Sequence, residues 1–263
     1  MNLILILKKI MNDIVRIPEN LFDENNHYFG KPAEFNDRII DRRIRILESF
    51  GGFLGKNLNL LDIGTGNGAT LFKLAPKIKY GLGIDITDAH QMQFETYKKL
   101  HNIENVDFKI VDISSFRFNQ KFDRIISFEV IEHLKSEDLL QFYYDSLIED
   151  GLMAITVPNK WWIFETHGAK LPLLPWNRVP FFSWLPTPIH EKFANARIYT
   201  KKRIVNLLEK HNFQVIDVFY VTAPMDVLPE GKLKSFLINY IFDKDTTRNP
   251  FKAVSIFVLA RKI

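Results

Sequence analysis

Cysteine is absent from this chain of 263 residues, so no disulfide framework can hold its fold together. The absence is typical of intracellular proteins, and we expect a cytoplasmic one. A long hydrophobic run is also missing near the start, where residues 3–7 are apolar but Lys8 and Lys9 follow at once. Five apolar residues are too few to span a bilayer. The longer apolar run and small-residue cleavage site of a secretory signal peptide are not found there either. We expect residues 3–7 to form a first helical turn or a strand.

Charge of one sign is not massed anywhere in the chain. The formal net charge is +4 and the pI is near 9.0, but the basic residues are dispersed. A dispersed excess is weaker than the basic stripe of a typical nucleic-acid-binding protein, so we expect a small-molecule partner rather than nucleic acid. Internal repeats are absent too. With 46% hydrophobic residues, the chain can bury one sizeable core, as a soluble enzyme does.

The most informative stretch is rich in glycine. Residues 58–63 predict a strand and residues 69–75 predict a helix, with Gly64, Gly66 and Gly68 between them. A strand, a tight turn and a helix N-terminus let a nucleotide-like ligand lie against bare backbone. The spacing differs from that of a dinucleotide fingerprint, and the Lys-Ser/Thr of a Walker loop is missing. An ordinary strand-to-helix turn is the alternative.

Acidic residues stand at the ends of the next two predicted strands. Residues 80–86 contain Asp85, and residues 106–111 are followed by Asp112. An acid at the end of the second strand of a βαβ unit is placed to accept hydrogen bonds from a ribose diol. Either aspartate could instead be solvated or cap a helix.

The first predicted helix, residues 33–50, carries apolar residues at near-helical spacing. Arg38, Arg42, Arg43 and Arg45 stand between the apolar positions. Charged residues in this pattern favour a solvated helix face over a binding patch.

Strands and helices alternate along the rest of the chain. Further helices are predicted at 89–101, 136–148 and 201–211, and further strands at 122–128, 152–157, 213–221 and 253–260. This alternation requires a mostly parallel sheet with helices on both faces. We therefore expect an α/β fold with seven strands, the last two forming an antiparallel hairpin at the edge.

Four motifs, in this order along the chain, carry a family resemblance. They are LDIGTGNG at 61–68, GIDI at 83–86, VDIS at 111–114 and FDRIISFEVIEHL at 122–134. In motif order and spacing the chain resembles the class I S-adenosylmethionine-dependent methyltransferases, in particular the domain type of ubiquinone and menaquinone biosynthesis. The resemblance is strong over residues 58–158 and looser beyond. It implies a Rossmann-like fold and S-adenosylmethionine as the cofactor.

The resemblance also implies roles for the residues that match the motifs. Backbone at Gly64, Gly66 and Gly68 would approach the methionine and ribose portions of the cofactor. Asp62 would help hold the methionyl amino end, and Asp85 the ribose hydroxyls. Asp112 would bind the exocyclic amine of adenine, with Ile86 and Ile113 flanking the ring, and Phe128 is the remaining cofactor-binding residue.

The acceptor side of the reaction calls for a base, because a hydroxyl acceptor must lose its proton. His133, His167 and His190 are the candidate catalytic residues. His167 would reach the acceptor from the segment around it, with Glu165 to orient it, or it is a surface histidine.

We also expect a metal site, which would be built around residues 129–133. Glu129, Glu132 and His133 have the i, i+3, i+4 spacing of one helical face. The resemblance implies that such a cluster, with a later histidine such as His190, can hold a divalent cation like Mg²⁺. Some quinone-precursor O-methyltransferases and small-RNA 2′-O-methyltransferases are built in this way. Alternatively, the glutamates cap a helix and the histidine packs.

Two segments do not fit the alternation of strands and helices. Residues 159–190 hold all four tryptophans and many prolines, which favours a lid over the acceptor pocket or an insert packed against its own domain. Residues 225–250 carry another apolar patch, expected as a pocket wall, an interfacial element or a dimer surface. We expect one domain over 1–263, divided into an N-terminal helical segment 1–50, a cofactor-binding half 51–158, the lid 159–190 and a C-terminal half 191–263.

The favoured function is O-methylation of a small or lipid-like acceptor, such as a quinone precursor, a polyketide-like ring or a lipid-linked sugar. The aromatic lid favours an acceptor with a hydrophobic part. RNA 2′-O-methylation with a divalent metal is the alternative enzyme activity. An inactive cofactor-binding module is a third hypothesis, and the intact glycines and acids argue against it. Aromatic residues in the lid also suggest peripheral membrane contact. A homodimer is a further possible assembly.

Overall fold

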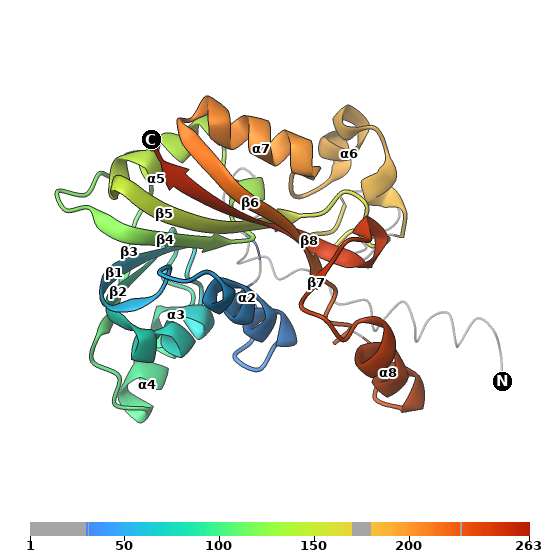
Figure 1. Ribbon diagram of the computed structural model, residues 1–263, viewed down its shortest axis with the longest axis horizontal. Helices are drawn as coiled ribbons and strands as arrows, with labels where there is room; N and C mark the ends of the chain where they lie inside the picture. The colour runs from blue at the N-terminus through green and yellow to red at the C-terminus, as the bar shows by residue number, and fades with distance from the viewer. Residues whose placement is uncertain (1–29, 31, 170–179, 227) are drawn as a thin grey trace.

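The computed structural model describes residues 30, 32–169, 180–226 and 228–263. The predictions for residues 3–7 and for Trp176 lie outside this part of the chain. Within it, one sheet is flanked by helices on both faces (Figure 1). The strands are β1 (Gly55–Ile63), β2 (Ile78–Asp85), β3 (Val106–Ile110), β4 (Phe122–Phe128), β5 (Leu147–Pro158), β6 (Phe213–Thr222), β7 (Thr246–Thr247) and β8 (Ala253–Lys262). The longer helices are α2 (Arg38–Ser49), α3 (Ala69–Leu74), α4 (Gln91–Leu100), α5 (Leu140–Ser146), α6 (Thr187–Phe193), α7 (Lys201–Lys210) and α8 (Lys232–Phe236).

The order of strands in the sheet is β3-β2-β1-β4-β5-β8-β6-β7. The first five pair in parallel, whereas β8 runs antiparallel between β5 and β6. The predicted α/β fold with a mostly parallel sheet and an antiparallel C-terminal edge is confirmed. The sheet has one strand more than expected, because two residues of the segment 225–250 pair with β6 as β7.

The strand order reverses between β1 and β4, and this reversal decides where a ligand can bind. Helices that follow β1 and β4 leave the sheet in opposite directions, so a crevice opens outside the carboxyl ends of these strands. The glycine-rich residues that follow β1 therefore stand at the mouth of the crevice.

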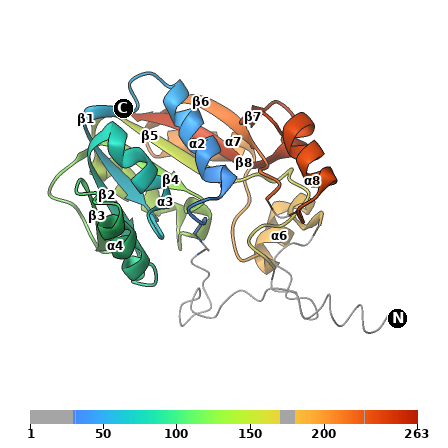
Figure 2. The same cartoon turned by 90° about the horizontal axis from the view of Figure 1, so that it is seen from below.

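Two hydrophobic cores lie on opposite faces of the sheet. Leu60 packs in the core with α2, α3 and α4, while its neighbour Leu61 packs in the core with α5 and α7. Successive strand residues point to opposite faces, so both leucines are fully buried. In Figure 2, α3 and α4 lie at the β2–β3 end of the sheet, and α6 and α8 lie at the other end.

Helix α2 differs from the expectation of a solvated arginine face. Arg42 is buried, and its guanidinium donates hydrogen bonds to the carbonyl oxygens of Thr222, Phe242 and Lys244. Arg43 is also buried. The expectation was wrong for these two arginines. Residues 242 and 244 supply acceptors to Arg42 that the local sequence pattern does not reveal, and Arg43 is paired with Glu129.

Within the described residues, none of the helices combines the length and the apolar composition needed to cross a membrane.

Candidate functional site

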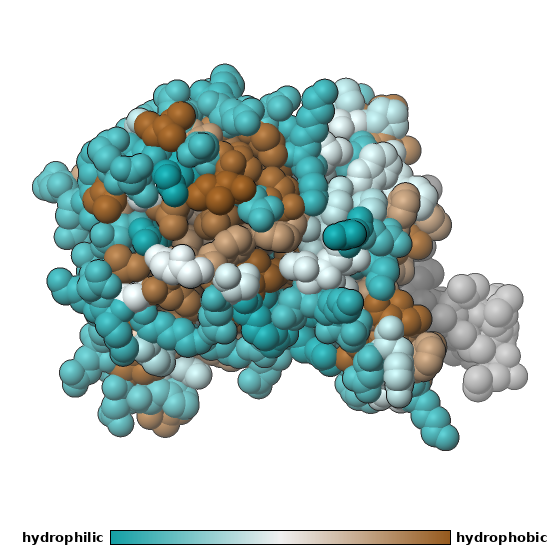
Figure 3. Space-filling view, in the orientation of Figure 1, coloured by the Kyte–Doolittle hydropathy of each residue, from teal (hydrophilic) through white to brown (hydrophobic). Residues whose placement is uncertain are grey.

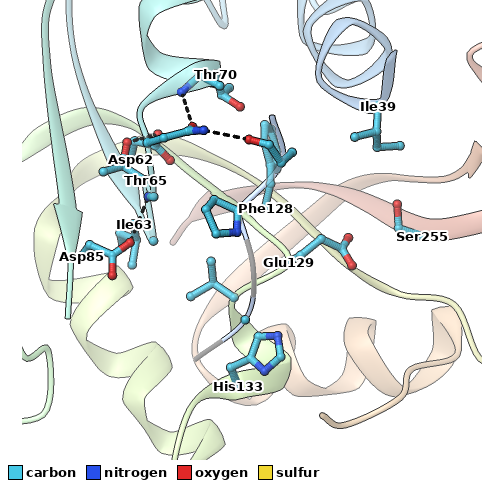
Figure 4. A pocket seen from close by; sticks show the side chains of 18 of the residues that line it. Ile39, Asp62, Ile63, Thr65, Thr70, Asp85, Phe128, Glu129, His133 and Ser255 are labelled. Carbon is cyan, nitrogen blue, oxygen red and sulfur yellow. Dashed lines mark hydrogen bonds between the residues drawn. The ribbon is translucent and has the colours of Figure 1, made fainter. Parts of the chain in front are cut away.

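A cavity of about 540 Å³ opens at the carboxyl ends of β1, β2 and β4 (Figure 4). One end of it is lined by the residues that follow β1 and β2, and the other by residues from α2, from the chain after β4 and from the segment after β5. All the residues predicted to bind the cofactor line this cavity except Gly68, whose α-carbon packs against Phe72 and Phe94 instead.

The glycine loop, residues 64–68, has a backbone that other residues would strain. Gly64 has a φ of +73°, and a Cβ atom built on it would lie 2.4 Å from Cγ2 of Val130. The amide of Gly66 donates a hydrogen bond of 2.9 Å to Oδ2 of Asp85. Glycine tolerates this conformation because it has no side chain. The loop is thus held against the end of β2.

Two buried or half-buried aspartates face this end of the cavity. Asp62 accepts a hydrogen bond of 2.7 Å from Oγ1 of Thr65, and burial raises its pKa from 3.8 to about 7. Burial also raises the pKa of Asp85, while its hydrogen bond from Gly66 opposes the shift. Both carboxyl groups line the cavity, and each can accept further hydrogen bonds from a ligand, because a carboxylate has about four lone-pair sites.

Farther along the same wall lies Asp112, which is exposed. Its carboxylate accepts hydrogen bonds from Ser114, and these lower its pKa, so it carries a full negative charge at neutral pH. Ile86 and Ile113 line the cavity beside it. An acid between two aliphatic side chains can select a flat ring that bears a hydrogen-bond donor.

An ion pair that the sequence did not predict lies at the opposite end of the cavity. Nη2 of Arg43 is 3.0 Å from Oε1 of Glu129, and the guanidinium lies 5.3 Å from the centre of the Phe128 ring. Burial lowers the pKa of Arg43, and the charge of Glu129 opposes the shift. Glu129 has a φ of +59°, which turns its side chain into the cavity (Figure 4). Arg43 follows the half-buried Ile39 and the buried Ile40 by one helical turn, but its pairing with Glu129 is a tertiary contact that the local sequence pattern does not reveal.

A second cluster combines Glu132, His133 and His167. One ligand-capable atom from each lies within 4.8 Å of the others, and Nε2 of His167 is 3.5 Å from Oε1 of Glu132. Glu132 is buried, and within the described part of the chain neither of its oxygens accepts a hydrogen bond. Burial, and then the charge of Glu129, raise the pKa of Glu132 well above its usual range. His133 and His167 line the cavity.

His190 lies away from the cavity wall. It is completely buried, and its Nε2 is 2.6 Å from Oε2 of Glu165. The other oxygen of Glu165 accepts a hydrogen bond of 3.0 Å from the backbone amide of His167. The structure therefore brings His167, rather than His190, to Glu132 and His133, and it places Glu129 beside Arg43.

Apolar side chains complete the end of the cavity opposite the glycine loop. Trp162 and Phe164, from the predicted lid, line the cavity and contact each other with ring centres 6.0 Å apart. Met225, from the second insert, lines it as well. The cavity thus joins a polar, glycine-lined end to an end with aromatic walls and a group of titratable side chains.

Curated methyltransferases are similar to this chain in sequence. The ubiquinone biosynthesis O-methyltransferase of Pelagibacter ubique (strain HTCC1062) is 29% identical to the chain over 230 residues, which span 80% of this chain and 90% of the relative. The (S)-coclaurine N-methyltransferase of Thalictrum flavum subsp. glaucum is 31% identical over 100 residues, which span 37% of this chain and 28% of that enzyme.

A solved structure of coclaurine N-methyltransferase, bound to N-methylheliamine and S-adenosylhomocysteine, has the same fold. It superposes with a TM-score of 0.56 at 17% identity, over 98% of this chain and 86% of that one. Residues 33–218 match the sequence profile of a family described as a methyltransferase domain. This match spans the glycine loop, the acidic strand ends and the Glu132 cluster, so the chain belongs to the methyltransferase domain family and is an S-adenosylmethionine-dependent methyltransferase.

Proposed function

We propose that this methyltransferase transfers its methyl group to a hydroxyl oxygen of a small acceptor with a large apolar part. The observation that carries the proposal is that His133 and His167, which lie beside the buried Glu132, line the same cavity as the glycine loop. A quinone precursor, a polyketide-like ring or a lipid-linked sugar has the required chemistry.

The cofactor supplies an activated methyl group, and the chain has to hold it in one orientation. In this proposal the methionine and ribose portions lie along the backbone of Gly64 and Gly66. Asp62 holds the methionyl amino group, and Asp85 accepts hydrogen bonds from the ribose hydroxyls. The raised pKa values of both aspartates support this fit, because donors from a ligand would stabilise their charged forms.

The adenine ring would lie farther along the same wall. There Asp112 accepts a hydrogen bond from the exocyclic amine, while Ile86 and Ile113 flank the ring. Phe128 stands at the junction with the acceptor end, where its ring also faces Arg43.

The acceptor would lie between the aromatic walls and the histidines. Trp162 and Phe164 hold its apolar part and exclude water. As the oxygen–carbon bond forms and the carbon–sulfur bond breaks, the hydroxyl proton passes to a nitrogen of His133 or His167. Oε1 of Glu132 lies 3.5 Å from Nε2 of His167, and the positive charge of the imidazolium that results favours the ionised form of Glu132.

A divalent cation such as Mg²⁺ is the alternative to a histidine base in this proposal, because a histidine nitrogen that binds a cation cannot also take the hydroxyl proton. A buried carboxylate without a hydrogen bond, as in Glu132, is costly unless it is protonated or binds a cation. Together with His133 and His167 it offers one oxygen and two nitrogen ligands. A cation at this position would polarise the acceptor hydroxyl. This set differs from the predicted one by having His167 in place of Glu129 and His190.

The test is methyl transfer from radiolabelled S-adenosylmethionine to a panel of catechols, alcohols, amines and RNA. We expect labelled ethers from catechols with apolar side chains, and loss of the label in His133→Ala and His167→Ala but not in the control His101→Ala. Labelled amines would replace the proposal by N-methylation. Labelled RNA, bound with a steep salt dependence, would favour the nucleic-acid alternative. Tight binding of S-adenosylhomocysteine without any labelled product would favour a binding module.

The cation is tested separately by calorimetry with Mg²⁺ alone. We expect binding to the wild-type chain and none to Glu132→Ala. If Mg²⁺ does not bind and a chelator leaves the rate of methyl transfer unchanged, the cation is no part of the reaction and the histidines act as bases by themselves.

A further inference from the structure

Four aromatic side chains, three of them in the predicted lid, form an exposed cluster. Phe181 and Phe251 are each 52% exposed, Trp184 is 38% exposed and Trp161 is 36% exposed. The ring centres are 5.0 Å apart between Phe181 and Trp184, 5.5 Å between Trp184 and Phe251, and 6.3 Å between Trp161 and Phe251. Contiguous exposed aromatics are rare on a surface that meets only water. We call these residues the aromatic cluster.

The chain below the aromatic cluster holds it in place. Oγ of Ser183 donates a hydrogen bond of 2.7 Å to the carbonyl oxygen of Trp162, and Nζ of Lys160 donates one of 2.6 Å to that of Leu185. Nε1 of Trp184 donates to the carbonyl oxygen of Trp161 at 3.2 Å. The cluster is thus anchored by polar contacts to the chain beneath it, while its rings stay at the surface.

A basic recess adjoins the aromatic cluster. Lys201, Lys244, Arg248 and Lys252 line it, with Asp243 as the single acidic side chain among its lining residues in the described part of the chain. The short helix Pro250–Lys252 joins the two features, because it places Phe251 in the cluster and Lys252 in the recess. In Figure 3, hydrophobic and hydrophilic residues lie side by side on the right of the molecule, the side of α6 and α8 in Figure 1.

We infer that the aromatic cluster and the basic recess together bind the surface of an anionic lipid bilayer. Phenylalanine and tryptophan rings partition into the boundary between headgroups and acyl chains, and the indole N–H keeps a polar partner there. Lysine and arginine at the same surface attract anionic headgroups. The recess carries the charge that complements such a surface, so an anionic bilayer is favoured over a second protein or a neutral membrane.

The aromatic cluster lies close to the cavity, and this position suggests what bilayer binding would serve. Phe164 lines the cavity and is also 37% exposed, and it follows Trp161 of the aromatic cluster by three residues. A bilayer bound to the cluster therefore lies next to the aromatic wall of the acceptor end. A lipid-like acceptor could then pass from the membrane into the cavity without crossing water. This last step rests on the proposed function, whereas bilayer binding does not.

The experiment is co-sedimentation of the whole chain with vesicles of phosphatidylcholine, alone or with phosphatidylglycerol. We expect binding to the anionic vesicles that weakens as salt is added. The triple variant Phe181→Ser, Trp184→Ser, Phe251→Ser should lower the partition coefficient roughly tenfold or more. The double variant Lys244→Glu, Arg248→Glu should remove the preference for anionic vesicles.

Matched controls distinguish binding through this face from nonspecific binding of vesicles by exposed apolar or charged side chains elsewhere. Met92→Ser removes another highly exposed apolar side chain, and Lys79→Glu with Lys99→Glu reverses two exposed charges elsewhere. Both controls should bind vesicles as the wild type does. Calorimetry with S-adenosylhomocysteine verifies that each variant is folded. If the triple variant does not fold, the double variant Lys244→Glu, Arg248→Glu tests the inference.

Failure of the wild type to sediment with anionic vesicles would overturn the inference, as would equal losses in the variants and their controls. Neither result would touch the proposed function, which is read from methyl transfer to soluble acceptors. Conversely, vesicle binding without methyl transfer to any hydroxyl would leave the lipid surface in place and remove the proposed reaction.

Discussion

Glu165 and His190 form a buried pair whose oxygen and nitrogen are 2.6 Å apart, and this pair lies directly behind a residue of the cavity wall. The second oxygen of Glu165 accepts the backbone N–H of His167. Asn195 also fixes His167 by donating a hydrogen bond of 3.0 Å to its carbonyl oxygen. Glu165 is therefore a positioning residue for His167.

Removal of this carboxylate should displace His167 without touching the cofactor. We expect Glu165→Ala to lower kcat much more than it changes the affinity for S-adenosylhomocysteine, and to cost about 1–3 kcal/mol of unfolding free energy. Glu165→Gln, which keeps an acceptor oxygen, should recover part of kcat. The exposed Glu230→Gln serves as the control. Equal kcat values for the Ala and Gln variants would contradict the positioning role.

Asp85 should dominate the affinity for the cofactor. A carboxylate that accepts hydrogen bonds contributes about 1.5–3 kcal/mol for each bond, so Asp85→Ala should weaken binding of S-adenosylhomocysteine at least tenfold. The neighbouring exposed Asp88, which does not line the cavity, provides the control variant Asp88→Ala. Isothermal calorimetry measures both. An unchanged dissociation constant for Asp85→Ala would refute its assignment to the ribose.

Backbone strain and steric clash in the glycine loop can be separated by two alanine variants. Gly64 and Gly52 both have positive φ values, +73° and +85°, but only at Gly64 would a Cβ atom meet a neighbour, Val130. Gly52→Ala should cost about 1 kcal/mol of unfolding free energy from conformation alone. Gly64→Ala should cost about 1–3 kcal/mol more because of the clash. Chemical denaturation with matched m-values checks the difference, and equal costs would mean that the loop shifts freely.

Asp62 should make the stability of the ligand-free protein depend on pH. Its pKa rises from 3.8 to about 7 on folding, so the folded state binds more protons than the unfolded state between these values. The free energy of unfolding should therefore fall as pH rises from about 4 to 7, by up to about 1.4 kcal/mol per pH unit, and level off above. Asp62→Asn should flatten this slope. Urea denaturation across this pH range measures the free energy of unfolding of the wild type and of Asp62→Asn. The same pH dependence in both proteins would disprove the role of Asp62.

The fold class, and the residues that line the glycine-lined end of the cavity, could be predicted from the sequence because both depend on short-range patterns. A strand, a glycine turn and an acid at the next strand end stand within a few residues of one another, and the parallel sheet brings them together. The acceptor end depends on the path of long segments. Whether His167 or His190 reaches Glu132 is decided by how residues 159–190 fold back.

The buried arginines of α2 illustrate the same limit. Arg42 and Arg43 stand at positions that local periodicity assigns to solvent. Arg42 is buried because carbonyl oxygens from about 200 residues farther along the chain surround it. Burial of this kind is a property of tertiary contacts, and no window along the helix contains the information.

The place of β8 between β5 and β6 has a consequence for the order of events during synthesis. β8 follows every other strand along the chain, yet β6 pairs with β5 only through it. While the ribosome is still making residues 253–262, β6 and β7 have no partner that ties them to the parallel strands. The cofactor-binding half can fold early, but the sheet closes only when its last strand has emerged, and until then the edge of β5 needs protection from other chains.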